Sequence, residues 1–386
     1  MSSPSTTSAS RIHPALLRKA IKSTGTMNTK RLSYPPGIGD WLVASLSILC
    51  TLTFSPEAQA TPPKNTVVAT VNVGSSPGGL VCSPDSNFVY VSIAGGIAVI
   101  DTTTNQLSTN FSVPGSQSFL AIAPDGKTLY ASAIVNTSGG VQVISTADGS
   151  VTTTIPIFLP SELTLTPDGS QLWVCNSINT GGIYIVDTAS NTVVGGPITI
   201  SGQVPVILVF TPNGTDAFAL YSEVGSIPMY LVQIDALTQT IKNSNFAGKA
   251  LHGSSGLRQP TILSMDPNGK TMYVYDTAAK FLIEAVAVKS QKAKGISPRS
   301  VDSDYCQTMT PNGKYLYIYE AKNVSTDATI KSISTETGEV VGRTVTVGLP
   351  DPINFELPVI AVAPNGKYAY VSNNSEGTVT VIDIQE

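Results

Sequence analysis

One short motif recurs seven times in this chain, and that recurrence restricts the fold more than any other feature. The copies read SPDSNFVYV, APDGKTLYA, TPDGSQLWV, TPNGTDAFA, DPNGKTMYV, TPNGKYLYI and APNGKYAYV, and their prolines are Pro84, Pro124, Pro167, Pro212, Pro267, Pro311 and Pro364. Successive prolines are 40, 43, 45, 55, 44 and 53 residues apart. A period of this length is typical of proteins assembled from one repeated unit of secondary structure.

Each copy of the motif predicts a β-hairpin followed by two further strands. A short apolar run such as FLAIA precedes the proline, which fixes φ, and the following Asp or Asn caps the turn while Gly takes a positive φ at little cost. Alternating Tyr and Val residues then predict a second strand, segments such as IAVID and TVTVID a third, and NTVVGGPITI a fourth. Each repeat therefore predicts four antiparallel strands.

Several of the predicted third strands end in aspartate, namely Asp101, Asp187, Asp235 and Asp383. An aspartate at the end of a strand accepts hydrogen bonds from the backbone N–H groups of the next turn. We therefore predict that these four carboxylates cap turns and take no part in catalysis.

Seven units of four antiparallel strands predict an all-β fold, a seven-bladed β-propeller over residues 61–386. The segment at residues 65–74, NTVVATVNVG, resembles the fourth-strand segment at residues 191–200, whereas the chain ends on a third strand, TVTVIDIQE. We expect the amino-terminal segment to be the outer strand of the last blade. This pairing would close the ring and protect sheet edges that a linear array exposes.

The sequence of motifs resembles the YVTN-type β-propeller repeat over about residues 65–386, because PDGKxxYV is followed by a VID-type strand and a TNTVV-type strand. That family contains secreted and surface-layer proteins, so the resemblance implies surface display or protein binding. Enzymes such as lactonases share similar rings, and a ring that accompanies a redox enzyme of the cell envelope is a third reading by analogy. The fifth repeat departs from the pattern after FLIEAVAV, which predicts an irregular outer strand.

The first 60 residues are predicted to be an N-terminal extension and a secretory signal peptide. An uncharged apolar run of 14 residues, WLVASLSILCTLTF, follows a pair of basic residues and precedes SPEAQA, in which Ala58 and Ala60 form an A-x-A cleavage site. The run is shorter than the roughly 20 residues that a membrane-spanning helix needs. We expect cleavage after Ala60 and a secreted or periplasmic mature chain without a transmembrane span.

Charge and residue counts exclude several functional classes. Residues 61–386 hold 16 basic and 24 acidic side chains, which argues against nucleic acid as a partner. This region contains a single histidine, His252, in a segment that reads as a loop. A single histidine argues against a His-based metal site and against histidine-dependent hydrolysis. The region also has no nucleophile elbow, phosphate-binding loop or CxxC motif, which argues against a redox carrier as well.

A candidate site is expected on one face of the ring, around the central channel. In a propeller, the segment entering each innermost strand and the loop between the second and third strands lie on the same face. The polar residues that alignment of the repeats places there are Glu162, Arg258, Gln259, Asp302, Asp304, Tyr305, Gln307 and Glu356. Three readings remain open: a ligand site, a solvated channel mouth, or a structural ion pair of Arg258 across the ring.

The main functional hypothesis is a binding scaffold for a protein or a cell-surface partner, with a small-molecule ligand as a further option. No recognisable set of catalytic residues is present, so an enzyme is the less favoured class. The alternative is a lactonase-like hydrolase in which Glu162, Asp304 and Glu356 hold a divalent cation that polarises an ester carbonyl. No cofactor is predicted for the scaffold, and Ca²⁺ or Mg²⁺ is the metal that the alternative requires.

Overall fold

The computed structural model describes residues 62–135, 138–176, 181–223, 228–246, 251–252, 263–275, 283–296, 304–321, 328–348 and 359–385. The chain divides into two compact units, residues 1–59 and 60–386, and every described residue belongs to the second. The predicted N-terminal extension and signal peptide lie outside the described residues. None of the helices in the described part has the length and apolar character needed to cross a membrane.

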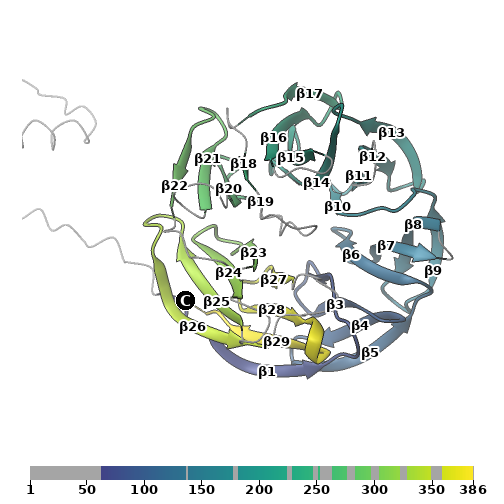
Figure 1. Cartoon of the computed structure of the whole chain (residues 1–386). Coiled ribbons are helices and arrows are strands. Elements are labelled where there is room, and N and C mark those ends of the chain that lie inside the picture. The colour runs from purple at the N-terminus through teal and green to yellow at the C-terminus, as the bar shows by residue number, and fades with distance from the viewer. Residues whose placement is uncertain are drawn as a thin grey trace, which may run out of the picture. The chain divides into compact units, whose positions relative to one another are not determined.

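Seven antiparallel sheets stand in a ring around a central axis, as the repeat predicted (Figure 1). The innermost strands are β2 (Leu80–Cys82), β6 (Ser116–Ile122), β10 (Leu163–Leu165), β14 (Gln203–Phe210), β19 (Leu263–Met265), β23 (Asp304–Met309) and β27 (Ile360–Val362). The second strands are β3 (Phe88–Ile93), β7 (Thr128–Val135), β11 (Gln171–Cys175), β15 (Asp216–Glu223), β20 (Thr271–Tyr275), β24 (Tyr315–Ala321) and β28 (Tyr368–Asn373).

The outer half of each blade follows in the same order. The third strands are β4 (Gly96–Asp101), β8 (Ser138–Ser145), β12 (Ile183–Asp187), β16 (Pro228–Asp235), β21 (Ile283–Ala287), β25 (Ala328–Ser334) and β29 (Thr378–Asp383). The outer strands are β5 (Gln106–Ser112), β9 (Val151–Ile155), β13 (Thr192–Ile198), β17 (Thr240–Asn243), β22 (Ala293–Gly295), β26 (Val340–Val347) and β1 (Thr66–Asn72). A 3₁₀ turn, η1 (Asn374–Glu376), joins β28 to β29.

The amino-terminal strand closes the ring, which confirms the sequence prediction. β1 pairs with β29 along its whole length, so blade 7 combines the first strand of the described chain with the last three. Asn65, immediately before β1, is buried and reaches into blade 6. Its amide nitrogen donates to Ser332 Oγ at 2.8 Å and to the Arg343 carbonyl at 2.9 Å, and its Oδ1 accepts the Tyr317 hydroxyl at 2.5 Å.

The Pro-Asp/Asn-Gly segments form the tight turns that their composition predicted. In every blade the Asp or Asn Oδ1 accepts a backbone N–H two residues later, and the acceptors are Asp85, Asp125, Asp168, Asn213, Asn268, Asn312 and Asn365. The turn glycines have φ between 68° and 73°. Blade 1 has Ser86 in place of the glycine, with φ at 62°.

The predicted turn-capping role of the third-strand aspartates is confirmed. Their Oδ1 atoms accept backbone N–H groups of the following turn, in the pairs Asp101–Thr103 (2.7 Å), Asp187–Ser190 (2.7 Å), Asp235–Thr238 (2.8 Å) and Asp383–Gln385 (3.1 Å). The Thr103 hydroxyl donates to Asp101 and the Ser190 hydroxyl to Asp187; together with the backbone bonds, these hydroxyl bonds lower the pKa of both carboxylates, which stay ionised at neutral pH.

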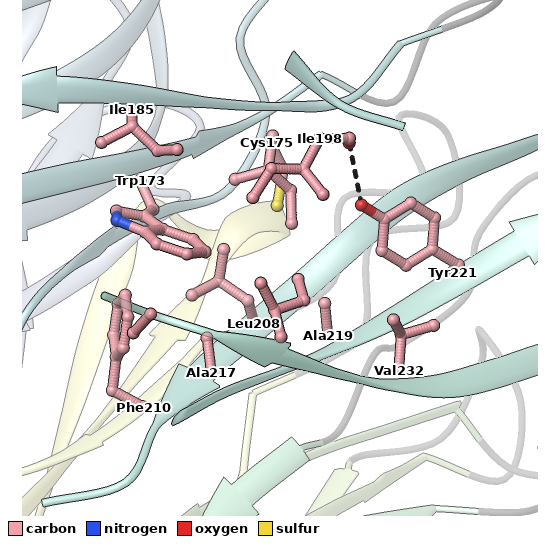
Figure 2. Packing of buried hydrophobic residues seen from close by; sticks show 13 residues of the cluster. Trp173, Cys175, Ile185, Ile198, Leu208, Phe210, Ala217, Ala219, Tyr221 and Val232 are labelled. Atoms are coloured by element: carbon pink, nitrogen blue, oxygen red, sulfur yellow. Dashed lines mark hydrogen bonds between the residues drawn. The ribbon is translucent and has the colours of Figure 1, made fainter. Parts of the chain in front are cut away.

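The core lies between neighbouring blades, where apolar side chains of adjacent sheets pack together. The third residue of every second strand is a buried aromatic residue: Tyr90, Tyr130, Trp173, Phe218, Tyr273, Tyr317 and Tyr370. Figure 2 shows the cluster between blades 3 and 4, where Trp173 meets Phe210 edge to face with ring centroids 5.1 Å apart. Across the same interface, the Tyr221 hydroxyl of blade 4 donates to the Ile198 carbonyl of blade 3 at 3.0 Å.

Two details of blades 4 and 5 depart from the regular repeat. The outer strand of blade 5, β22, has only three residues, in agreement with the irregularity predicted from its sequence. His252 was expected in a loop, but it forms the two-residue strand β18 (Leu251–His252), which pairs with β16 and gives blade 4 a fifth strand. The backbone hydrogen bonds of that pairing override the loop-like composition of the segment.

Candidate functional site

The antiparallel order of the blades gives the ring two different faces. The Pro-Asp/Asn-Gly turns and the turns between third and fourth strands lie on one face, which we name the turn face. The connections that enter the innermost strands and the ends of the second strands lie on the other, which we name the entry face. The sequence placed the candidate site on the entry face.

The structure locates part of the predicted site. Glu162 directly precedes β10 on blade 3, and Asp304 and Tyr305 are the first residues of β23 on blade 6, so all three positions are on the entry face. Blades 3 and 6 stand on different sides of the central axis (Figure 1). The side chains of Asp304 and Tyr305 are not part of the described structure, and Arg258, Gln259, Asp302 and Glu356 lie outside the described residues.

Glu162 has a half-buried carboxyl group at the end of blade 3. Its backbone carbonyl accepts the Cys175 N–H at 2.9 Å, and its side chain makes no hydrogen bond to any described residue. Burial raises the pKa of Glu162 to about 7, and burial together with the nearby Glu162 raises the pKa of the Cys175 thiol. Glu162 can therefore exchange a proton or bind a hydrogen-bond donor near neutral pH, while Cys175 remains protonated.

The raised pKa of Glu162 predicts a specific pH dependence of stability. Its ordinary value is 4.5, so the folded protein holds this proton more tightly than the unfolded chain does. This contribution to the free energy of unfolding is fully present below pH 4.5. It falls by on the order of 2 to 3 kcal/mol as the pH rises to about 7. Glu162→Gln is expected to remove this decline, measured by denaturant unfolding across the pH range.

The matched control is Glu339→Gln, which changes an exposed glutamate in the turn before β26. This variant should keep the pH profile of the unsubstituted protein. Equal profiles for the two glutamine variants would show that Glu162 does not titrate near neutral pH.

Gln307, another predicted site residue, has a structural contact in β23. Its amide nitrogen donates to the Tyr273 carbonyl at 2.9 Å and approaches Ser264 Oγ at 3.4 Å, which links blade 6 to blade 5. Its Oε1 is buried and accepts no hydrogen bond from the described residues. That oxygen is the part of the side chain still available to a donor.

The described part of the chain contains no assembled set of ligands for a divalent metal ion. No group of three or more His, Cys, Asp or Glu side chains there is arranged to hold a metal ion. Two of the three proposed carboxylate ligands, those of Asp304 and Glu356, are outside the described part, so the metal site stays a prediction. Of the three proposed ligands, only Glu162 has a described carboxylate, and it offers two oxygen atoms.

Blades 2 and 3 carry an apolar patch on the entry face that was not predicted from the sequence. Three large side chains are exposed there: Phe119 by 38%, Ile134 by 49% and Phe158 by 60%. Phe119 lies on β6, Ile134 on β7, and Phe158 in the connection between β9 and β10. We call these three residues the apolar patch, and Glu162 lies four residues beyond Phe158 on the same connection.

Direct contacts join the elements that carry the apolar patch. The Phe119 N–H donates to Ser132 Oγ on β7 at 2.9 Å. Gly139 pairs with Ile134 across the hairpin of β7 and β8, and a Cβ atom on Gly139 would lie 2.0 Å from the Leu159 nitrogen. The connection bearing Phe158 therefore packs against the backbone opposite Ile134, and only glycine allows that approach.

The backbone next to Phe158 is strained. Leu159 has φ at 46°, a region that a branched side chain rarely adopts. The Asn176 side chain donates to the Phe158 carbonyl at 2.6 Å and holds the connection in this conformation. Strained residues persist where the surroundings fix them and are common at functional sites.

Further carboxylates near the entry ends of blades 4 to 6 were also missed. Glu223, the last residue of β15, accepts the Tyr230 hydroxyl at 3.1 Å. Glu284 is buried in β21, and Glu320 is buried in β24, where it forms an ion pair with Lys331. Glu284 and Glu320 lie in strands that are otherwise apolar or aromatic, so their sequence context resembled that of ordinary core strands.

A groove of about 490 Å³ opens on the turn face between blades 6 and 7, with Pro311, Asn312, Asn365 and Lys367 in its lining. In blades 2 to 6 the turn glycine sits close to the turn proline of the preceding blade, as in the pairs Gly169–Pro124 and Gly313–Pro267. Gly366 has no such contact. Asn365 instead donates its N–H to Ser86 Oγ of blade 1 at 3.0 Å, which ties this turn to blade 1 rather than to blade 6.

Comparison with known proteins identifies the architecture. No family model matches the sequence, and no curated protein matches it. Among solved structures 1561 chains match, and one is a chain of Kuenenia stuttgartiensis hydrazine synthase, with 21% identity and a TM-score of 0.64. The match covers 84% of this chain and 98% of that chain. At this identity the likeness shows the fold alone, so the chain is a seven-bladed β-propeller and its resemblance to the YVTN-type repeat stays a prediction.

Proposed function

We propose that this protein is a secreted or periplasmic binding scaffold that docks a protein or cell-surface partner on its entry face. The observation that carries the proposal is the apolar patch of Phe119, Ile134 and Phe158. Exposed aromatic side chains held on a rigid backbone are typical of binding hot spots, because their burial needs little ordering. The propeller fold, with the signal peptide predicted from residues 1–60, fits such a role.

Glu162 adds a polar anchor near the apolar patch. A partner that covers Phe158 comes within reach of a carboxyl group that has no hydrogen bond to any described residue, and a donor on that partner would be shielded from water there. The expected partner surface is therefore apolar with a hydrogen-bond donor or cation at its margin. The metal-dependent hydrolase remains the alternative function.

Substituting the apolar patch is expected to abolish partner binding without unfolding the ring. The test variant is Phe119→Ser, Ile134→Ser and Phe158→Ser, and the readout is recovery of a cross-linked partner from the native cell envelope. Hot-spot truncations cost about 2 kcal/mol or more each, so recovery should fall at least roughly a hundredfold. Circular dichroism should be unchanged, because the three side chains are exposed.

The chain offers a control in which three exposed apolar side chains are removed elsewhere on the ring. Val194, Leu237 and Val340 are exposed by 56%, 79% and 48%, and they lie on outer strands or on the turn face. Their triple serine variant should bind the partner normally. If both triple variants lose the partner equally, the entry face is not the docking surface. If lactone hydrolysis appears with Ca²⁺ and disappears in Glu162→Gln, the hydrolase replaces the scaffold.

A further inference from the structure

A basic patch stands at the outer corner of blade 5 on the turn face. It consists of four exposed lysines: Lys270, Lys289, Lys292 and Lys294. The Lys270 carbonyl accepts the Val288 N–H at 2.8 Å and the Lys292 carbonyl accepts the Ala287 N–H at 3.0 Å, so the inner turn and the outer turn that carry these lysines are joined. None of the four ammonium groups forms an ion pair or hydrogen bond with a described residue.

The turn face carries the opposite charge on blades 1 to 3. Six aspartates form this acidic arc: Asp85, Asp101, Asp125, Asp148, Asp168 and Asp187. They lie in the inner and outer turns of three consecutive blades, with Lys127 as the one cation among those turns. No carboxylate of the arc forms an ion pair with a described residue. Hydrogen bonds from Ser83 and Asn87 lower the pKa of Asp85, and similar bonds lower the pKa of Asp148 and Asp168.

The basic patch and the acidic arc lie on opposite sides of the same face. In a ring of seven, blade 5 stands across the channel from blades 1 and 2, as the positions of β22 and β4 in Figure 1 show. A two-fold axis in the plane of that face, perpendicular to the line from patch to arc, would place each patch on the arc of a second copy. Both contacts would form together.

We propose that two copies of this chain associate through their turn faces, with the basic patch of each copy on the acidic arc of the other. Residues 61–386 hold 24 acidic and 16 basic side chains, so two copies repel each other in most orientations. Opposed patches select the one arrangement in which attraction exceeds this repulsion. This contact uses the turn face, so it is independent of partner binding on the entry face.

Sedimentation velocity of the full chain over a range of protein concentrations tests the proposal. The protein is expected to form a dimer at low ionic strength that dissociates at high salt, because exposed charges are screened. The arc variant is Asp85→Asn, Asp125→Asn and Asp168→Asn. Blades 4 to 7 naturally carry asparagine at this turn position, with the same backbone hydrogen bond, so the variant should fold.

Neutralising either partner surface should weaken the dimer at least roughly tenfold. The variant of the basic patch is Lys270→Gln, Lys289→Gln and Lys292→Gln, and the control is Glu336→Gln with Glu339→Gln on the outer turn of blade 6. The control should dimerise like the unsubstituted protein. A chain that sediments as a monomer at every salt concentration, or a dimer that both neutralised variants leave unchanged, overturns the proposal.

Discussion

Replacing Asn65 with alanine should lower the free energy of unfolding by about 3 to 5 kcal/mol, because two buried hydroxyls and one partly buried carbonyl of blade 6 lose a partner at once. These are the Ser332 hydroxyl, the Arg343 carbonyl and the Tyr317 hydroxyl. Asn65 also precedes the strand that joins the two ends of the ring. Denaturant unfolding of the purified protein measures the change.

Asn191 is a matched control within the same chain. Both residues open the tetrapeptide NTVV before an outer strand, and their φ angles are similar, 49° for Asn65 and 54° for Asn191. The backbone strain of an alanine at positive φ is therefore the same in both variants. The Oδ1 of Asn191 is buried without a hydrogen-bond partner, so Asn191→Ala should cost about 1 kcal/mol or less. Equal losses would mean that the bonds of Asn65 to blade 6 contribute nothing to closure.

The sequence predicted the ring because its fold depends on short-range signals that repeat. Proline, then Asp or Asn, and then Gly define the turn within four residues in six of the seven copies, and alternating Tyr and Val residues predict the strand that follows. The closing strand was also predictable, since residues 65–68 repeat the letters of residues 191–194. Asn65 was not identified as a link to blade 6, because its three partners are more than 250 residues away in the chain.

The candidate site was predicted less completely, and the reason is physical. Glu162 stood out because its repeat position is apolar or small in other blades, and the structure gives it an unusual pKa. The apolar patch gave no such signal, because Phe119 and Ile134 occupy positions where strands normally carry apolar residues. Whether such a side chain is exposed depends on the packing of the next blade and on the path of the connection through Leu159, which no local pattern encodes.

Replacing Trp173 with alanine should cost about 3 to 5 kcal/mol, since it removes the largest fully buried side chain between blades 3 and 4. Trp173 is 0% exposed and lies against Phe210 and Ile185 (Figure 2). Its ring nitrogen donates to Gln171 Oε1 at 3.1 Å. The readout is again the free energy of unfolding, and the loss should exceed that of a comparable substitution on the outer rim.

The control for Trp173 follows from the repeat itself. Five other blades carry tyrosine at this position, so Trp173→Tyr keeps an aromatic ring in a site that accepts one and should cost about 1 kcal/mol. A double-mutant cycle of Trp173→Ala with Phe210→Ala isolates the edge-to-face contact, which should contribute about 0.5 to 1.5 kcal/mol. If Trp173→Tyr destabilised the protein as much as Trp173→Ala, the interface would depend on the shape of the indole ring rather than on apolar burial. The blades would then not be interchangeable units, and the repeat would specify their backbone but not their packing.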